Sequence, residues 1–168
     1  MRSLALHTGP LRTAIHALKY KHNPALAQSL AQLMAHHWPT DLPANAVLMP
    51  VPLSTERLHE RGFNQAELLA RQLGYYRHLK VKTSILERHK FTRPQVGLNA
   101  HQRRDNVAGA FSANLQQIQS TTFILIDDVC TTGATLGACA EALLQRGAQQ
   151  VWAYTLARAP RADTDYPN

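Results

Sequence analysis

Residues 123–135 read Phe-Ile-Leu-Ile-Asp-Asp-Val-Cys-Thr-Thr-Gly-Ala-Thr and carry the strongest structural signal in the chain. The first four residues are apolar without alternation, a pattern typical of a parallel strand that is covered on both faces. Two acids, Asp127 and Asp128, close this predicted strand, and a polar loop then leads into a predicted helix at residues 135–146. A buried strand that passes through a short loop into a helix predicts an α/β protein.

The loop after the two acids has the composition of a phosphate-binding site. Ligands of open α/β sheets bind at the carboxyl ends of the strands. Backbone N–H groups that precede a helix bind a phosphate monoester, because the positive end of the helix dipole lies behind them, and threonine hydroxyls add donors. Gly133 has no Cβ atom and lets the backbone approach the anion closely. The predicted phosphate-binding residues are Thr131, Thr132, Gly133, Ala134 and Thr135.

A bound phosphate would limit the roles that the neighbouring Asp127 and Asp128 could have. Two carboxylates would repel the anion unless they face away from it, toward sugar hydroxyls or a Mg²⁺ ion. A phosphate, a diol and a metal together indicate a phosphorylated ribose. Acidic pairs at strand ends also occur in phosphoacceptor receiver domains, but those proteins lack a Thr-Thr-Gly-Ala-Thr loop, and we therefore favour the sugar phosphate.

The rest of the chain alternates predicted helices with short apolar strands. The predicted helices begin at Pro10, at Asn23-Pro24 and at Asn64, the last ending at Gly74, and the predicted strands lie at 46–49, 84–86, 108–111 and 151–156. This alternation favours a mainly parallel central sheet flanked by helices. We expect one domain, 1–168, made of a small helical N-terminal cap (1–45), an α/β core (46–158) and a frayed tail (159–168).

Charge and composition narrow the function classes. Eight bases and one acid between Arg77 and Arg104 give this segment the whole net charge of +7. This basic segment could bind nucleic acid, pyrophosphate or a sugar phosphate. Alternatively, it is a solvated face that keeps the protein dissolved. Two cysteines form neither a disulfide framework nor a four-ligand zinc set. Every apolar run falls short of the ~20 residues that span a bilayer, so we expect a cytoplasmic protein without membrane insertion.

Residues 123–135 resemble the 5-phosphoribosyl 1-diphosphate (PRPP) signature of type I phosphoribosyltransferases over nearly its full length. Other stretches resemble one branch of these proteins, the competence protein F (ComF) family. They are Ala17–Lys21, Pro50–Leu53, Arg57, Arg61–Gln65, Arg88 with Gln95 and Leu98, and Arg103–Asn106 leading to Gly109–Phe111. Members of that family often begin with a cysteine-rich zinc-binding segment. The present sequence begins without one, and no role of that segment is carried over.

The resemblance implies a type I phosphoribosyltransferase fold and a role for each matching residue. Asp127 and Asp128 would be the catalytic acids, holding the ribose 2′- and 3′-hydroxyls directly or through Mg²⁺, and residues 131–135 would hold the 5′-phosphate. The pyrophosphate would bind Val51, Pro52, Leu53 and Ser54, with Arg57 and Arg61. An alternative role for Arg61–Gln65 is to cap the helix that follows. Residues Glu87–Asp105 are predicted as one long loop, and its basic part, Arg88–Arg104, would be a flexible lid that closes over PRPP. Lys90, Arg93, Arg103 and Arg104 of this lid would neutralise the leaving pyrophosphate.

Two functions fit this resemblance. The first is a Mg²⁺-dependent phosphoribosyltransferase that displaces pyrophosphate from PRPP with an unknown acceptor. Thr131 stands where the 6-oxopurine branch has a carboxylate, and because a threonine does not take the proton from a purine nitrogen, purine salvage is disfavoured. The second is a non-catalytic PRPP-binding protein that binds single-stranded DNA or a DNA-processing partner. Both agree with a role in natural competence, the uptake and use of external DNA, which the family implies.

Overall fold

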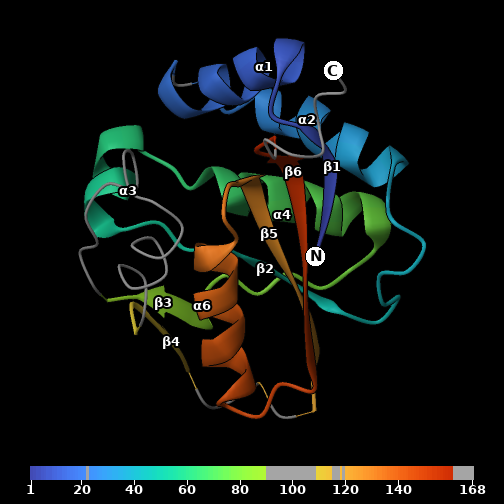
Figure 1. Ribbon diagram of the computed structural model, residues 1–168, viewed down its shortest axis with the longest axis vertical. Coiled ribbons are helices and arrows are strands. Elements are labelled where there is room, and N and C mark those ends of the chain that lie inside the picture. The colour runs from blue at the N-terminus through green and yellow to red at the C-terminus, as the bar shows by residue number, and fades with distance from the viewer. Residues whose placement is uncertain (22, 90–108, 115–117, 119, 161–168) are drawn as a thin grey trace.

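A four-stranded parallel sheet forms the centre of the protein. The computed structural model describes residues 1–21, 23–89, 109–114, 118 and 120–160 (Figure 1). The strand order is β1-β6-β5-β2. The strands are β1 (Arg2–Leu6), β6 (Gln150–Arg158), β5 (Thr122–Cys130) and β2 (Val47–Pro50), and all three neighbouring pairs are parallel. The predicted α/β class with a mainly parallel sheet is confirmed.

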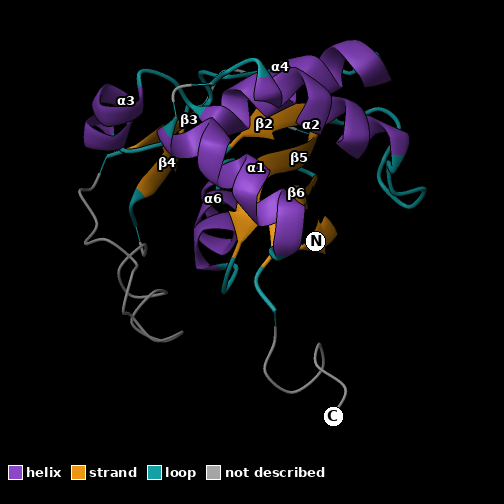
Figure 2. Ribbon diagram, turned by 90° about the horizontal axis from the view of Figure 1, so that it is seen from above, coloured by secondary structure: helices purple, strands orange, loops and turns teal. Residues whose placement is uncertain are grey.

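Helices cover both faces of this sheet, as Figures 1 and 2 show. One face packs against α1 (Gly9–Tyr20), α2 (Leu26–His36) and α4 (Gln65–Arg77). The other face packs against α6 (Ala134–Leu144) and a small antiparallel sheet of β3 (Leu86–Arg88) and β4 (Phe111–Ala113). A short helix, α3 (Thr55–Arg61), follows β2.

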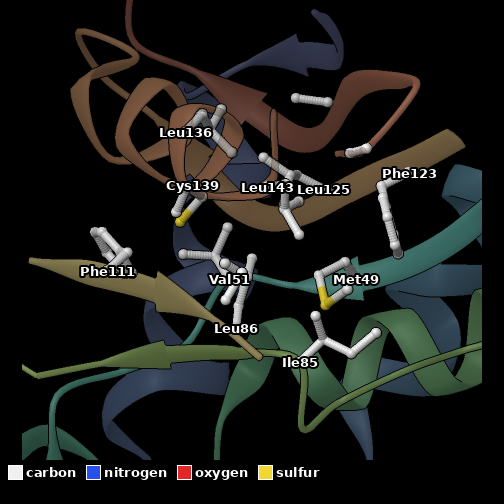
Figure 3. Packing of buried hydrophobic residues seen from close by; sticks show 14 of the residues in the cluster. Met49, Val51, Ile85, Leu86, Phe111, Phe123, Leu125, Leu136, Cys139 and Leu143 are labelled. Atoms are coloured by element: carbon white, nitrogen blue, oxygen red, sulfur yellow. The ribbon is translucent and has the colours of Figure 1, made fainter. Parts of the chain in front are cut away.

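The two faces of β5 carry different parts of the core. Phe123 and Leu125 belong to the cluster under α6, which Figure 3 shows, and Ile124 and Ile126 belong to the cluster under α1, α2 and α4. All four side chains are fully buried. Since successive strand residues point to opposite faces, a strand between two helical layers has no polar face, and the unbroken apolar run is explained.

Tyr154 of β6 joins the sheet to the end of α2. Its ring is fully buried and lies edge-on to Trp38, with ring centroids 5.4 Å apart. Its hydroxyl lies 3.1 Å from the Met34 carbonyl oxygen and 3.2 Å from that of His37. Carbonyls at the end of a helix have no partner inside the helix, and the Tyr154 hydroxyl supplies a donor at this end of α2.

Three elements differ from the sequence prediction. Residues 1–45 are predicted to form only a helical cap, whereas Arg2–Leu6 form the edge strand β1, which pairs with β6. Five residues are too few for a clear apolar pattern, and pairing with β6 fixes this strand. The helix predicted to end at Gly74 continues to Arg77 and ends with His78 in the left-handed region, at φ 53°. The helix α3 is absent from the prediction because seven residues give no clear period.

Gly74 is buried inside α4 because the following segment packs against it. A Cβ atom at this position would lie 2.4 Å from Val81 Cγ2 and 2.9 Å from the Leu79 carbonyl oxygen. Val81 in turn forms a parallel bridge with Leu48 of β2. Gly74 therefore allows the segment around Val81 to pack closely against α4. It is not the helix-ending residue with positive φ that the sequence predicts.

Part of the prediction concerns residues that the structure does not describe. The lid residues Lys90, Arg93, Arg103 and Arg104 lie outside the described residues, as does most of the predicted tail, 161–168. Glu87 and Arg88, predicted as the start of a long loop, form part of β3. Among the described residues, no helix has the length and apolar character needed to cross a membrane.

Candidate functional site

The two acids of the sequence motif lie inside β5, near its carboxyl end. Asp128 is buried, with 3% of its surface exposed, and Asp127 is partly buried. The Asp128 backbone N–H donates to Asp127 Oδ1 at 2.8 Å. Because β2 and β6 are parallel to β5, their carboxyl ends lie at the same edge of the sheet as the two acids.

The surroundings of Asp127 disfavour the charged form of its carboxyl group. Burial raises the pKa of this carboxyl to about 7, and the negative charge of Asp128 adds to the effect, while Lys19 opposes it. Burial and then the negative charge of Asp127 raise the pKa of the Cys139 thiol on α6. Asp127 is thus a carboxylate that gains from a cation or a hydroxyl donor placed beside it.

Asp128 already has a cation beside it. Lys19 Nζ, from the last turn of α1, lies 2.9 Å from Asp128 Oδ2, and the side chains of Lys19 and Asp128 are 18% and 4% exposed. The orientation leaves Oδ2 without a hydrogen bond. Lys19 lies in the stretch Ala17–Lys21, which carries part of the family resemblance, but the sequence predicts no role for it. Its position four residues after the buried Ile15, on the apolar side of the helix, is the signal that could have identified it.

The predicted phosphate loop connects β5 to α6. Gly133 is the N-cap of α6 and has φ 80°, a left-handed conformation that glycine adopts without strain. The Ala134 N–H lies 3.4 Å from Thr132 Oγ1, and the first turn of α6 contains no acidic residue. Thr131 and Thr132 are exposed. The N-terminus of an eleven-residue helix therefore lies next to an exposed loop of hydroxyls, as an anion site requires.

Residues 51–54 form the connection between β2 and α3. The Val51 N–H donates to the Ile126 carbonyl at 3.0 Å, so this loop starts beside the residue that precedes Asp127. The Asn64 side chain donates to the Val51 carbonyl at 3.0 Å. Ser54 caps α3 by accepting from the Arg57 N–H. The predicted pyrophosphate loop is thus next to the acids, and Val51, whose side chain is in the core, can offer only its backbone to a ligand.

Arg61 is a buried cation at the end of α3. It is 6% exposed. Its Nη1 donates to Gln65 Oε1 at 3.0 Å, its Nη2 lies 3.5 Å from the Tyr20 hydroxyl, and its Nε has no partner. Among the residues described, no carboxylate forms an ion pair with it. The helix-capping role belongs to Asn64, whose side chain accepts from the Ala66 N–H, and not to Arg61.

Arg57 and Arg88 add positive charge near the acids. Burial lowers the pKa of the Arg88 guanidinium, and the charge of Arg57 lowers it further, while Asp127 raises it. Arg88 also stacks over the Phe111 ring, 5.4 Å from its centroid. The sequence placed Arg88 in a mobile loop, whereas it belongs to β3, within electrostatic reach of Arg57 and Asp127.

The donor set fits magnesium that arrives with a phosphate ligand. Among the described residues, no group of three or more histidines, cysteines or acids is placed to hold a metal ion. Mg²⁺ prefers oxygen and usually binds through one or two carboxylates, with water and substrate phosphates completing its shell. Asp127 and Asp128 supply such carboxylates, and Oδ2 of Asp128, which accepts no hydrogen bond, is paired with the Lys19 ammonium group.

The family follows from comparison with known proteins. Residues 16–165 match the phosphoribosyl transferase domain. The chain belongs to this family. This phosphoribosyl transferase domain is 32% identical over 161 residues to the DNA utilization protein YhgH of Salmonella typhi, covering 93% of this chain and 70% of that one. It is also 32% identical over 161 residues to competence protein F of Haemophilus influenzae, covering 89% and 69%. The resemblance to the competence protein F branch is confirmed.

A solved structure agrees on the fold of this phosphoribosyl transferase domain. A glutamine PRPP amidotransferase from B. subtilis, complexed with ADP and GMP, superposes with a TM-score of 0.56 at 14% identity. The match covers 83% of this chain and 30% of that chain. The predicted type I phosphoribosyltransferase fold is confirmed.

Proposed function

We propose that this chain binds PRPP with Mg²⁺ at the carboxyl end of β5 and displaces its pyrophosphate with an acceptor. The observation that carries this proposal is the continuous run of two acids, an exposed threonine loop and a left-handed glycine that opens α6. Each part matches one part of the ligand. The acids suit the ribose hydroxyls, and the loop with the N-terminus of α6 suits the 5′-phosphate.

The arginines and the loop after β2 suit the pyrophosphate. The loop 51–54 starts beside the strand that carries the acids, and α3 follows it with Arg57 and the buried Arg61. Displacement at the anomeric carbon needs positioning of the two reactants and positive charge at the leaving group. Mg²⁺, when bound, supplies further positive charge to the pyrophosphate. Lys90, Arg93, Arg103 and Arg104 are proposed to close over the ligand.

A second candidate keeps the PRPP pocket without catalysis and uses a basic surface for single-stranded DNA or a DNA-processing partner. It is favoured by the relatives, one of which is a DNA utilization protein and another a competence protein. Within the basic segment, Arg77 and Lys80 are exposed and Lys82 is partly exposed. Phosphates of a nucleic acid are natural partners for such a surface. Either activity would operate in the cytoplasm during the uptake or use of external DNA.

Thermal unfolding with and without ligand tests the shared pocket. PRPP with Mg²⁺ should raise the melting temperature, because a ligand that binds only the folded state stabilises it. Asp128→Ala should abolish this increase, whereas Asp41→Ala, at an exposed acid that pairs with Arg2 of β1, should retain it. An equal shift in the Asp128→Ala variant would reject the proposed site.

Release of pyrophosphate separates the two candidates. Candidate amines, bases and nucleotide-derived acceptors are supplied with PRPP and Mg²⁺, and release above the hydrolysis background indicates transfer. Binding of PRPP without release, together with binding of single-stranded DNA that weakens steeply with salt, favours the second candidate. Retained DNA affinity after Lys80, Lys82, Lys90 and Arg93 are all changed to alanine would count against the basic surface.

A further inference from the structure

Two consecutive residues at the end of α1 contact two separate parts of the proposed site. Lys19 Nζ lies 2.9 Å from Asp128 Oδ2 on β5. The Tyr20 ring lies over the Arg61 guanidinium, with Arg61 Cζ 5.2 Å from the ring centroid, and the Tyr20 hydroxyl is 3.5 Å from Arg61 Nη2. The end of α1 therefore touches the proposed ribose end and the proposed pyrophosphate end together.

The ion pair between Lys19 and Asp128 uses the oxygen that a metal would need. The side chains are 18% and 4% exposed, so little water screens the charge of the ammonium group. A divalent cation and an ammonium group repel each other strongly at the distance that binding to one carboxylate oxygen would impose. The same contact supplies Asp128 with a counter-charge in the protein without ligand.

A phosphorylated ligand would offer the Lys19 ammonium group a second partner. Its side chain has four flexible carbons and a compact charge, and Tyr20 beside it already reaches the arginine at the end of α3. A pyrophosphate bound between Arg61 and the acids would offer oxygens to the ammonium group. Such a ligand could take Lys19 away from Asp128 and free the carboxylate in the same event.

We propose that Lys19 is a positioning residue that keeps divalent metal ions off the acid pair until a phosphorylated ligand is present. Metal and ligand then bind together, and the acids are not occupied by the metal alone. The inference rests on the proposed function, in which the acid pair serves PRPP with Mg²⁺. It differs from that function in assigning control of the metal to a residue of α1.

Binding of Mn²⁺ in the absence of PRPP tests the inference directly. Paramagnetic Mn²⁺ is titrated into the full chain and its free fraction is measured by electron paramagnetic resonance. Lys19→Met keeps the length of the side chain and removes its charge, and should bind Mn²⁺ about tenfold more tightly than the wild type, because the repulsion is gone. Lys19→Arg, which keeps the charge, should behave like the wild type.

Matched controls locate the effect and guard against unfolding. Lys21→Met removes an exposed charge two residues away and should leave Mn²⁺ binding unchanged. Asp128→Asn combined with Lys19→Met should lose the added affinity. Lys19→Gln, which keeps a polar group next to Asp128 without the charge, is the second neutral variant and should also gain affinity. If both neutral variants unfold, the Lys19 ammonium resonance, assigned with Lys19→Arg, should move with PRPP and Mg²⁺ and not with Mg²⁺ alone.

The outcomes separate this inference from the proposed function. Equal Mn²⁺ affinity in the wild type and in a folded neutral variant would overturn the role of Lys19, and so would a Lys19 resonance that moves with Mg²⁺ alone. Absence of PRPP binding by the wild type would instead overturn the proposed function. The Mn²⁺ comparison needs no PRPP and is interpretable in both cases.

Discussion

Asp127 and Asp128 are neighbours in the chain and face opposite layers of the protein. Successive side chains of β5 alternate between faces, and Asp128 meets Lys19 of α1 while the charge of Asp127 acts on Cys139 of α6. Asp128 has a cationic partner and Asp127 has none among its contacts in the described chain. Two adjacent carboxylates therefore differ in their electrostatic surroundings, which allows them different tasks toward one ligand.

Asp127→Asn should stabilise the protein at neutral and higher pH when no ligand or metal is present. The pKa of Asp127 rises from 3.8 to about 7 on folding, chiefly through burial. The native state then binds this proton more tightly than the unfolded chain does, and the free energy of unfolding falls as pH rises through that interval. Asparagine carries no charge and avoids this loss. Melting temperatures of both proteins, measured from pH 4 to pH 8 in buffer with chelator, provide the check.

The advantage of Asp127→Asn should grow across the same interval and be nearly absent at its acid end. Asp41→Asn serves as the matched control, because Asp41 is exposed and its ion pair with Arg2 contributes little. A stabilisation of Asp127→Asn that is the same at pH 4 and pH 8 would contradict the electrostatic explanation.

Gly133→Ala should weaken both the fold and ligand binding. The residue has φ 80°, and a Cβ atom would meet only Cys130 Sγ, at 3.9 Å, so the cost comes from the backbone conformation and not from a clash. We expect a loss of about 1–2 kcal/mol in the free energy of unfolding, together with weaker PRPP binding as the loop relaxes. Urea unfolding and calorimetry measure the two effects. Gly137→Ala, in the open interior of α6, should instead gain about 0.5–1 kcal/mol, and a similar response in both variants would refute this reading of Gly133.

Arg61→Met should separate ligand binding from stability. Removal of a buried charge that has no carboxylate partner in the described part of the chain favours the folded state, while loss of the bond to Gln65 opposes it. We expect a net change below about 2 kcal/mol. PRPP affinity should fall about tenfold or more because the proposed pyrophosphate site would lose one of its cations. Calorimetry on Arg61→Met and on Leu58→Met, an exposed residue of the same helix, tests this. Unchanged affinity with strongly reduced stability would make Arg61 a structural residue only.

Gly74→Ala should destabilise the protein although alanine favours helices. The gain of about 1 kcal/mol in helix propensity is opposed by a Cβ atom placed 2.4 Å from Val81 Cγ2 and 2.9 Å from the Leu79 carbonyl. Overpacking of this kind costs about 1–3 kcal/mol, and the clash with a carbonyl cannot be relieved by a side-chain rotation. Denaturant unfolding of Gly74→Ala, Val81→Ala and the double variant measures the coupling, which should be favourable. Simple additivity of the two changes would show that the contact does not limit this position.

The sequence predicts the central part of this fold well because that part is governed by burial. The run 123–126 is apolar on both faces, and the structure places it between two helical layers. Elements without a strong period could not be predicted in this way. The strand β1 is defined by its pairing with β6, and the helix α3 is defined by its Ser54 cap and the left-handed Gly62.

The site shows the same division. Its contiguous part, residues 127–135, is predictable because a strand end, a polar loop and a helix start lie next to one another in the chain. The contact of Lys19 with Asp128 joins residues 109 positions apart, and only the packing of α1 brings them together. The role of Gly74 could not be predicted for a similar reason. Val81 lies next to it because the chain folds back onto α4, and local helix geometry does not show this contact.

The pairing of β1 with β6 also affects the order in which parts of the sheet form. Ser3 Oγ and Thr155 Oγ1 lie 2.7 Å apart, although 152 positions separate them in the sequence. Contacts between such distant residues form late and slow the search for the native state. During translation β1 is made long before β6, its partner in the sheet. The strand β1 therefore stays without this partner until residues 150–158 have been made, and during that time it is open to chaperones or to wrong partners.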